Sequence, residues 1–163
     1  MKKISMILAA VLMTLTASAQ FQQGKAYLGA SMTGLNLHWN SSHGFDLGEE
    51  AKVGYLFTDD WMMVGTAAFD HYGKENKPDR ITAGAGLRYY IEQNGLYLGV
   101  NCKYIHDDHN YNDVMPGAEI GYAFFINRSV TIEPAVYYDH SFNDADYSTV
   151  GFKIGIGIYL FDD

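Results

Sequence analysis

The stretch Thr149–Phe161, TVGFKIGIGIYLF, decides the fold of this chain, because large apolar residues occupy every second position in most of it. Successive side chains of a β-strand point to opposite faces of a sheet. One face of the stretch therefore carries Val150, Phe152, Ile154, Ile156, Ile158 and Leu160. The other face carries Thr149, Gly151, Lys153, Gly155 and Gly157. This pattern predicts a strand with one apolar surface and one surface of glycine and charge.

Upstream of this stretch, the chain reads as seven more segments of strand length. The eight segments lie at about residues 25–38, 45–57, 61–72, 80–91, 96–106, 113–126, 129–140 and 148–161. Short turns at 58–60, 92–95 and 127–128 alternate with longer polar connections at 40–44, 73–79, 107–112 and 141–147. Outer-membrane barrels have tight periplasmic turns and longer external loops. We therefore predict an all-β protein, an eight-stranded antiparallel up-and-down transmembrane β-barrel.

Glycine indicates which surface faces inward. Thirteen glycines fall in the eight segments, and eleven of them lie on the polar face: Gly29, Gly48, Gly54, Gly84, Gly86, Gly99, Gly117, Gly121, Gly151, Gly155 and Gly157. The interior of an eight-stranded barrel is barely wide enough for side chains, so small residues there make room for long ones. This favours a membrane barrel with its polar face inside. A secreted soluble barrel with the apolar face inside is the alternative.

Long charged residues share the glycine face. They are Glu50, Lys52, Arg88, Lys103, Glu119, Glu133 and Lys153. Buried charges must be paired and hydrogen-bonded. We therefore expect an ion-pair network in the lumen, in which Arg88, Lys103 and Lys153 pair with Glu119, Glu133 or Glu50.

Aromatic residues collect near the segment ends, as they do at membrane–water interfaces. The expected periplasmic belt is Tyr55, Phe57, Trp61, Tyr89, Tyr122, Phe124 and Tyr159. The expected outer belt is Trp39, Phe45, Phe69, Tyr72, Tyr104, Tyr138 and Phe142.

Two irregularities are also expected in the strands. The first segment changes phase near Gly34, which a bulge explains. Pro134 removes a ladder donor in mid-strand, which usually marks an edge or a bulge.

The first 19 residues have the form of a signal peptide. Lys2 and Lys3 precede an apolar run that ends at Ala17-Ser18-Ala19, a small-x-small cleavage site. We expect the mature chain to be a single barrel domain, 20–163, in the outer membrane of a Gram-negative cell, in contact with membrane lipid. It would hold 9 basic and 19 acidic residues, a net charge of −10. Nucleic-acid binding needs clustered Lys and Arg, so it is excluded.

The residues resemble the small outer-membrane β-barrel domain family, with its OmpA-like and OmpX-like barrels. The carriers are VGYLF at 53–57, LRYYI at 87–91, GYAFF at 121–125, TIEP at 131–134 and GIGIYLF at 155–161. The resemblance implies a barrel without an open pore and with ion pairs in the lumen. Many members end on an aromatic residue that the barrel assembly machinery reads during biogenesis. In this chain two aspartates follow Phe161.

Candidate chemistry gathers at the outer segment ends. All six histidines map there: His38, His43, His71, His106, His109 and His140. His106 and His109 with neighbouring aspartates suit a divalent ion, but their spacing matches no defined metal motif. His140 and Ser141 are adjacent, so a strand would point them apart rather than form a nucleophile–base pair. Glu119 and Glu133 suit structural pairing better than acid–base catalysis. We therefore predict no catalytic residue, no metal site and no cofactor.

These observations favour a structural or surface-interaction role. An extracellular protein or a polysaccharide at the outer loops is the expected partner. A narrow channel or transport barrel is the second interpretation, and a lipid-modifying barrel enzyme is the third.

Overall fold

The computed structural model describes residues 21–35, 48–70, 80–91, 94–107, 111–143 and 148–160. The strands are β1 (Ala26–Leu35), β2 (Gly48–Thr58), β3 (Trp61–Asp70), β4 (Arg80–Tyr90), β5 (Leu96–Asp107), β6 (Tyr111–Tyr122), β7 (Phe124–Phe125), β8 (Val130–Asp139) and β9 (Thr149–Leu160). In the described residues no helix is long and apolar enough to cross a membrane.

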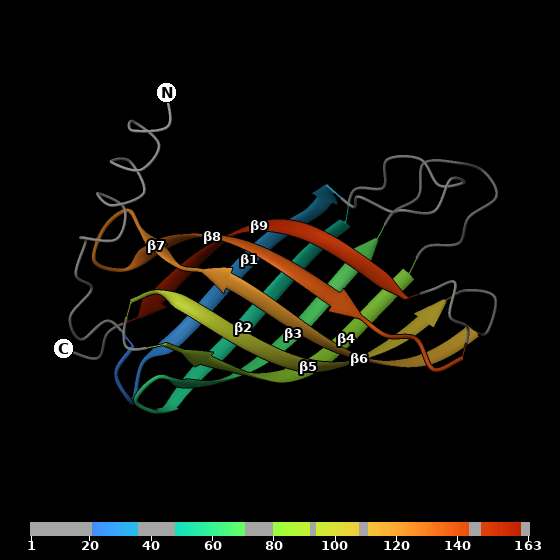
Figure 1. The fold of residues 1–163 in the computed structure, drawn as a ribbon, viewed down its shortest axis with the longest axis horizontal. Coiled ribbons are helices and arrows are strands. Elements are labelled where there is room, and N and C mark those ends of the chain that lie inside the picture. Colours follow the sequence, from blue (N-terminus) through green and yellow to red (C-terminus); the bar gives the residue numbers. More distant parts are fainter. Residues whose placement is uncertain are drawn as a thin grey trace, which may run out of the picture.

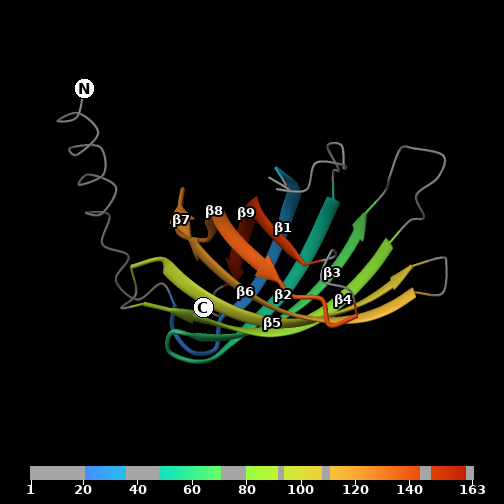
Figure 2. The ribbon, with the colours of Figure 1, turned by 45° about the vertical axis from the view of Figure 1, so that its right-hand side comes forward.

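The strands form one closed ring (Figure 1). Each strand from β1 to β6 pairs antiparallel with the next one along the chain, β8 pairs with β9, and β9 pairs with β1. Pairing between β6 and β8 closes the ring, and β7 is a two-residue continuation of β6. The prediction of an eight-stranded antiparallel up-and-down barrel is confirmed. In this ring order β8 lies opposite β3 and β9 lies opposite β4, and Figure 2 shows the same ring turned by 45°.

Burial alternates along the strands with the period of the sequence pattern. In β9, Lys153 is 4% exposed and Ile156 is 56% exposed. Large apolar side chains cover the outside of every long strand, while charged side chains are buried inside. The soluble-barrel alternative places the two faces the other way round and is wrong.

The expected bulge in the first strand is confirmed, since the register between β1 and β9 shifts between Thr33 and Leu35. The expectation of an edge or a bulge at Pro134 is wrong. The register of β6 and β7 against β8 is the same on both sides of the interruption, and Pro134 also stays in register with Ile154 of β9. Proline lacks an N–H group, so it interrupts the ladder without adding a residue.

The two ends of the barrel differ in their connections. We call the end with the tight turns at 59–60 and 126–129 the inner end, and the other end the outer end. Asp60 has a φ of 65°, and its backbone N–H bonds to the carbonyl of Phe21 at 2.9 Å. The short turns predicted around residues 58–60 and 127–128 are present. The longer connections predicted at the outer end lie mostly outside the described residues.

Candidate functional site

Arg88 of β4 lies at the centre of the lumen. Its side chain is 1% exposed, and its two terminal nitrogens bond to Glu133 Oε2 at 2.9 Å and to Glu119 Oε1 at 3.0 Å. The ring of Tyr97 lies against the guanidinium, 3.9 Å from its central carbon to the ring centroid. A guanidinium is always charged, and its planar fork suits two carboxylates at once. Arg88 thus ties together β4, β6 and β8.

Two lysines complete the network around Glu119. Lys153 Nζ lies 2.6 Å from Glu119 Oε2 and 3.4 Å from Glu50 Oε1. Lys52 Nζ lies 3.2 Å from Glu50 Oε1 and 3.5 Å from Glu119 Oε2. Ser31 also donates to Glu50 at 2.9 Å. Six of the seven residues expected in the lumen are therefore in contact through shared carboxylates.

Lys103 is the seventh residue, and it does not join this group. It pairs with Asp139 of β8, with Nζ and Oδ2 separated by 2.6 Å. Our expectation that Lys103 pairs with Glu119, Glu133 or Glu50 is therefore wrong. Asp139 has the same phase as Glu133 in β8, so the alternation would have found it. The seven residues that we expected in the lumen do not include Asp139.

Tyrosine hydroxyls supply the remaining partners of Glu133. Tyr27 donates to Oε2 at 2.9 Å, and Tyr159 donates to Oε1 at 3.2 Å. Thr131 also donates to Oε1 at 2.9 Å, and the hydroxyls of Tyr90 and Tyr159 are 2.7 Å apart. Tyr159 is fully buried, so its assignment to the periplasmic aromatic belt is wrong. Tyr159 has the same phase as Lys153 in β9, so its side chain points into the lumen.

A cluster of apolar and aromatic side chains fills the inner end of the lumen. We call it the inner plug: Phe21, Leu56, Met62, Tyr90, Tyr97 and Tyr159. Phe21 stacks on Tyr90 with ring centroids 3.8 Å apart and planes 12° apart. Its segment is held by the bond from Gly24 N to Leu56 O at 2.8 Å. We did not predict Phe21 as a lumen residue, because it precedes the first strand.

The inner plug also explains the third strand, which has no clear polar face in the sequence. Met62 and Val64 of β3 point inward and belong to the same buried cluster. Just before β1, Lys25 is buried at the inner end, and burial lowers the pKa of its ammonium group.

The cavity beside the ion-pair network is small. It measures about 20 Å³ and is lined by Thr66, Asn101, Lys103 and residues of the network. A cavity of this size holds about one water molecule. Thr66 Oγ1, Asn101 Oδ1 and Arg88 Nε are buried there without a hydrogen-bond partner among the described residues. A water molecule has the donors and acceptors that these groups need.

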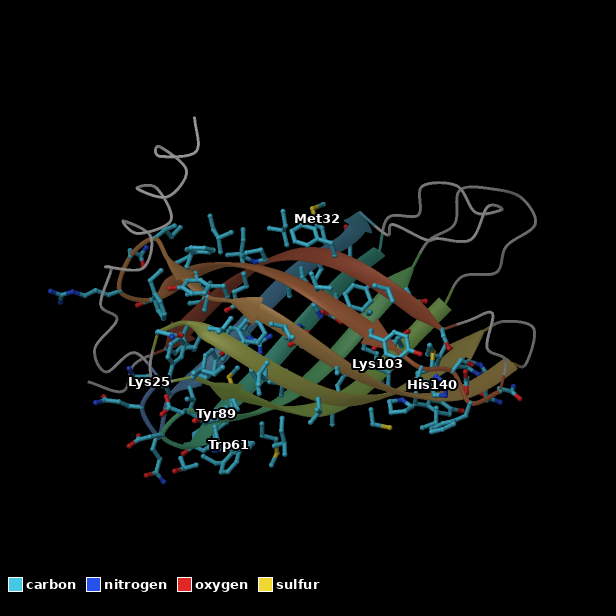
Figure 3. The ribbon with its side chains drawn as sticks, viewed as in Figure 1. Lys25, Met32, Trp61, Tyr89, Lys103 and His140 are labelled. Carbon is cyan, nitrogen blue, oxygen red and sulfur yellow. The ribbon has the colours of Figure 1, made fainter. Side chains whose placement is uncertain are left out.

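At the outer end, Ser141 and His140 point apart, as we predicted. Ser141 is buried and donates to Asp113 Oδ2 at 2.5 Å. His140 is exposed, and its Nδ1 lies 3.2 Å from the Tyr138 hydroxyl and 3.5 Å from Ser148 Oγ. Figure 3 shows His140 at the opposite end of the barrel from Trp61 and Tyr89. Ser141 and His140 therefore do not form a nucleophile–base pair.

His106 is also exposed, and its Nδ1 lies 2.8 Å from Asn112 Oδ1. The residues that the structure describes include no group of three or more His, Cys, Asp or Glu side chains arranged to hold a metal ion. His38, His43, His71 and His109 lie outside the described residues.

Several residues of the expected aromatic belts do lie on the outside. Trp61 and Tyr89 contact each other at the inner end with ring centroids 4.9 Å apart, and Tyr55 and Phe57 are exposed nearby. At the outer end Tyr104, Tyr138 and Phe142 are exposed. The side chain of Phe69 and all of Trp39, Phe45 and Tyr72 lie outside the described residues.

No model of a protein family matches this chain, and no curated protein matches it. Solved structures do. The Yersinia pestis outer membrane protein Ail, in a phospholipid bilayer nanodisc, has a TM-score of 0.56 and 14% identity, covering 85% of this chain and 100% of Ail. Neisserial surface protein A has a TM-score of 0.54 and 13% identity, covering 82% of this chain and 95% of that protein.

A de novo designed transmembrane β-barrel is equally similar. Its TM-score is 0.55 at 13% identity, and the match covers 85% of this chain and 98% of the design. At such low identity these likenesses concern the backbone fold. The chain has the fold of the small transmembrane β-barrels. No family model confirms the expected resemblance to OmpA-like and OmpX-like barrels.

Proposed function

We propose that this protein is an integral outer-membrane barrel whose role is interaction at the cell surface. The observation that carries the proposal is its inverted distribution of residues. Charged side chains such as Lys153 and Glu133 are buried, while Ile156 and its neighbours are exposed. In water this arrangement exposes apolar surface and is unfavourable, whereas lipid solvates the apolar face.

The filled lumen argues against the channel interpretation. The ion pair between Lys52 of β2 and Glu119 of β6 crosses the lumen, and the inner plug occupies one end. The cavity beside the ion pairs has room for about one water molecule. A conducting channel needs a continuous column of water. We expect the protein, reconstituted in a planar bilayer, to give no steady ion conductance, and a stable single-channel current would overturn this part of the proposal.

The enzyme interpretation lacks a site in the described residues. Ser141 donates to Asp113 rather than to His140. Glu119 and Glu133 are each held by Arg88, so neither is placed to exchange protons with a substrate. We propose that the protein is not an enzyme and carries no cofactor.

The charge of the outer connections defines the partner that we favour. The connections 36–47, 71–79, 108–110 and 144–147 hold six carboxylates and two lysines, a net charge of −4. Ail has been solved in complex with the heparin analogue sucrose octasulfate. An acidic surface repels such a polyanion, so we expect this chain to favour an external protein with a basic surface. A neutral polysaccharide is the second partner to test.

Fractionation tests the location. We propose that residues 1–19 are removed as a signal peptide and that the barrel assembly machinery inserts the mature chain. The expected result is recovery in the outer-membrane fraction, with folded and boiled samples migrating differently on a gel. Recovery of the protein from the periplasm without detergent would overturn the proposal.

A further inference from the structure

The β6–β8 seam, where these two strands close the ring, is paired differently from the others. β6 pairs with β8 over Gly117–Gly121, the ladder stops, and β7 resumes it over Phe124–Phe125. The ladder between β4 and β5, by contrast, is unbroken over Arg80–Tyr90. Backbone hydrogen bonds hold neighbouring strands of a barrel together, so an interrupted ladder marks a weaker seam.

Two prolines, one in each strand, weaken the β6–β8 seam. The backbone N–H of His140 donates to the carbonyl of Pro116 at 2.8 Å, but Pro116 has no N–H to give in return. Backbone groups of alternate residues point to the same side, so Tyr122 also directs its groups toward β8. In this register Tyr122 faces Pro134, which likewise has no N–H. The seam therefore lacks one donor on each side of its central ladder.

Side chains compensate for this weakness inside the lumen. The pair Lys103–Asp139 joins β5 to β8 across β6, with Nζ and Oδ2 separated by 2.6 Å. Gly117 of β6 lies under this pair, and a Cβ on it would collide with Asp139 Oδ1. Deeper in the lumen, Arg88 joins β4 to Glu133 of β8 at 2.9 Å. Both ion pairs hold β8 in place from strands beyond its immediate neighbour.

We infer that the barrel opens sideways along the β6–β8 seam and that the pair Lys103–Asp139 is the latch at the outer end of that seam. Asp139 is the last β8 residue in the ladder with β6, opposite Gly117, so the latch stands where the ladder ends. Release of the latch leaves the outer end of the seam held by few backbone bonds and by the hydrogen bond from Ser141 to Asp113 of β6. The opened seam connects the polar outer half of the lumen laterally with the membrane.

Hydrogen exchange of the barrel in lipid nanodiscs tests this inference. We expect amides of residues 135–140 to exchange about tenfold faster than amides of residues 98–104 in β5, the ratio that loss of one hydrogen bond produces. Lys103→Met should accelerate exchange further in 135–140 alone. The matched control is Glu50→Gln, which weakens an ion pair between β2 and β9, away from the seam. It should leave the ratio between the two segments unchanged.

The double variant Pro116→Ala with Pro134→Ala gives an independent test, because it restores both missing donors. It should slow exchange at 135–140 to the rate of the β5 segment, whereas Val136→Ala in the same strand should not. Equal exchange of the two segments in the native barrel would overturn the inference. So would a double proline variant that leaves the exchange at 135–140 unchanged, or a Lys103→Met pattern identical to that of Glu50→Gln.

Discussion

Lys52 of β2 and Glu119 of β6 meet across the full width of the barrel. Lys52 Nζ and Glu119 Oε2 are 3.5 Å apart, although three strands separate β2 from β6 in either direction around the ring. Side chains that reach each other across the diameter leave no open passage at that level. The glycines on the lumen face make this contact possible. Gly99, for example, lies so close to Glu119 that a Cβ would come within 2.6 Å of its Cγ.

The buried carboxylates should be far more important for stability than exposed ones. Glu50 is 6% exposed and contacts Lys52 and Lys153, whereas its neighbour Glu49 is exposed. Removing one partner of a buried pair leaves an uncompensated charge and costs about 3–5 kcal/mol. We expect Glu50→Ala to lower the free energy of unfolding by this amount in lipid vesicles. Glu49→Ala is the matched control, and an equal loss in both variants would contradict a packed, charged lumen.

The outer face of β9 should respond to charge according to depth. Ile156 and Val150 are both 56% exposed, but Ile156 lies well inside the strand and Val150 lies near its outer end. Arginine near the bilayer midplane costs about 2–4 kcal/mol, and near an interface about 0–1 kcal/mol. We expect Ile156→Arg to reduce the stability of the barrel folded in lipid by the larger amount and Val150→Arg to reduce it by the smaller amount. Insensitivity to Ile156→Arg would mean that this face does not contact lipid.

Glycines on the two faces should differ in their tolerance of a methyl group. A Cβ on Gly86, in the lumen, would collide with the backbone carbonyl of Val100, which cannot move away easily. A Cβ on Gly65, on the outer face, would meet Val53 Cγ2 at 3.4 Å and the Val53 carbonyl oxygen at 4.0 Å, both ordinary contacts. Overpacking costs about 1–3 kcal/mol, so Gly86→Ala should lower stability by that much in a denaturant titration. Gly65→Ala should be neutral or slightly stabilising, because glycine in the interior of a strand is destabilising relative to alanine.

The segment before β1 should contribute strongly to the stability of the barrel. Phe21 is fully buried and stacks on Tyr90, whereas the adjacent Gln22 is exposed. Truncation of a buried phenylalanine costs about 3–5 kcal/mol. We expect Phe21→Ala to lower the free energy of unfolding by this amount and to raise the mobility of the Tyr90 ring in NMR spectra. Gln22→Ala should change neither quantity, and a silent Phe21→Ala would show that the inner plug does not stabilise the barrel.

Local pattern predicts most of the architecture of this protein. The alternation of apolar and polar residues depends only on strand geometry. This pattern therefore identifies the eight strands of the barrel and the two faces of each strand. Phase also selects the long charged residues that enter the lumen, such as Arg88 and Glu119. Phase applied without exception would also have placed Tyr159 and Asp139 inside. Tyr159 was misassigned because its position near a strand end was given more weight than its phase.

The amino-acid sequence by itself determined which side chains of each strand face inward, because that property depends on one strand at a time. Only the tertiary structure decided which inward side chains meet. The tilt and register of the strands set the height of each residue in the lumen, so Lys103 reaches Asp139 rather than a glutamate. Closure of the ring also brings Phe21, which belongs to no strand, onto Tyr90. Contacts between distant strands depend on how all the strands assemble, and no local sequence pattern carries that information.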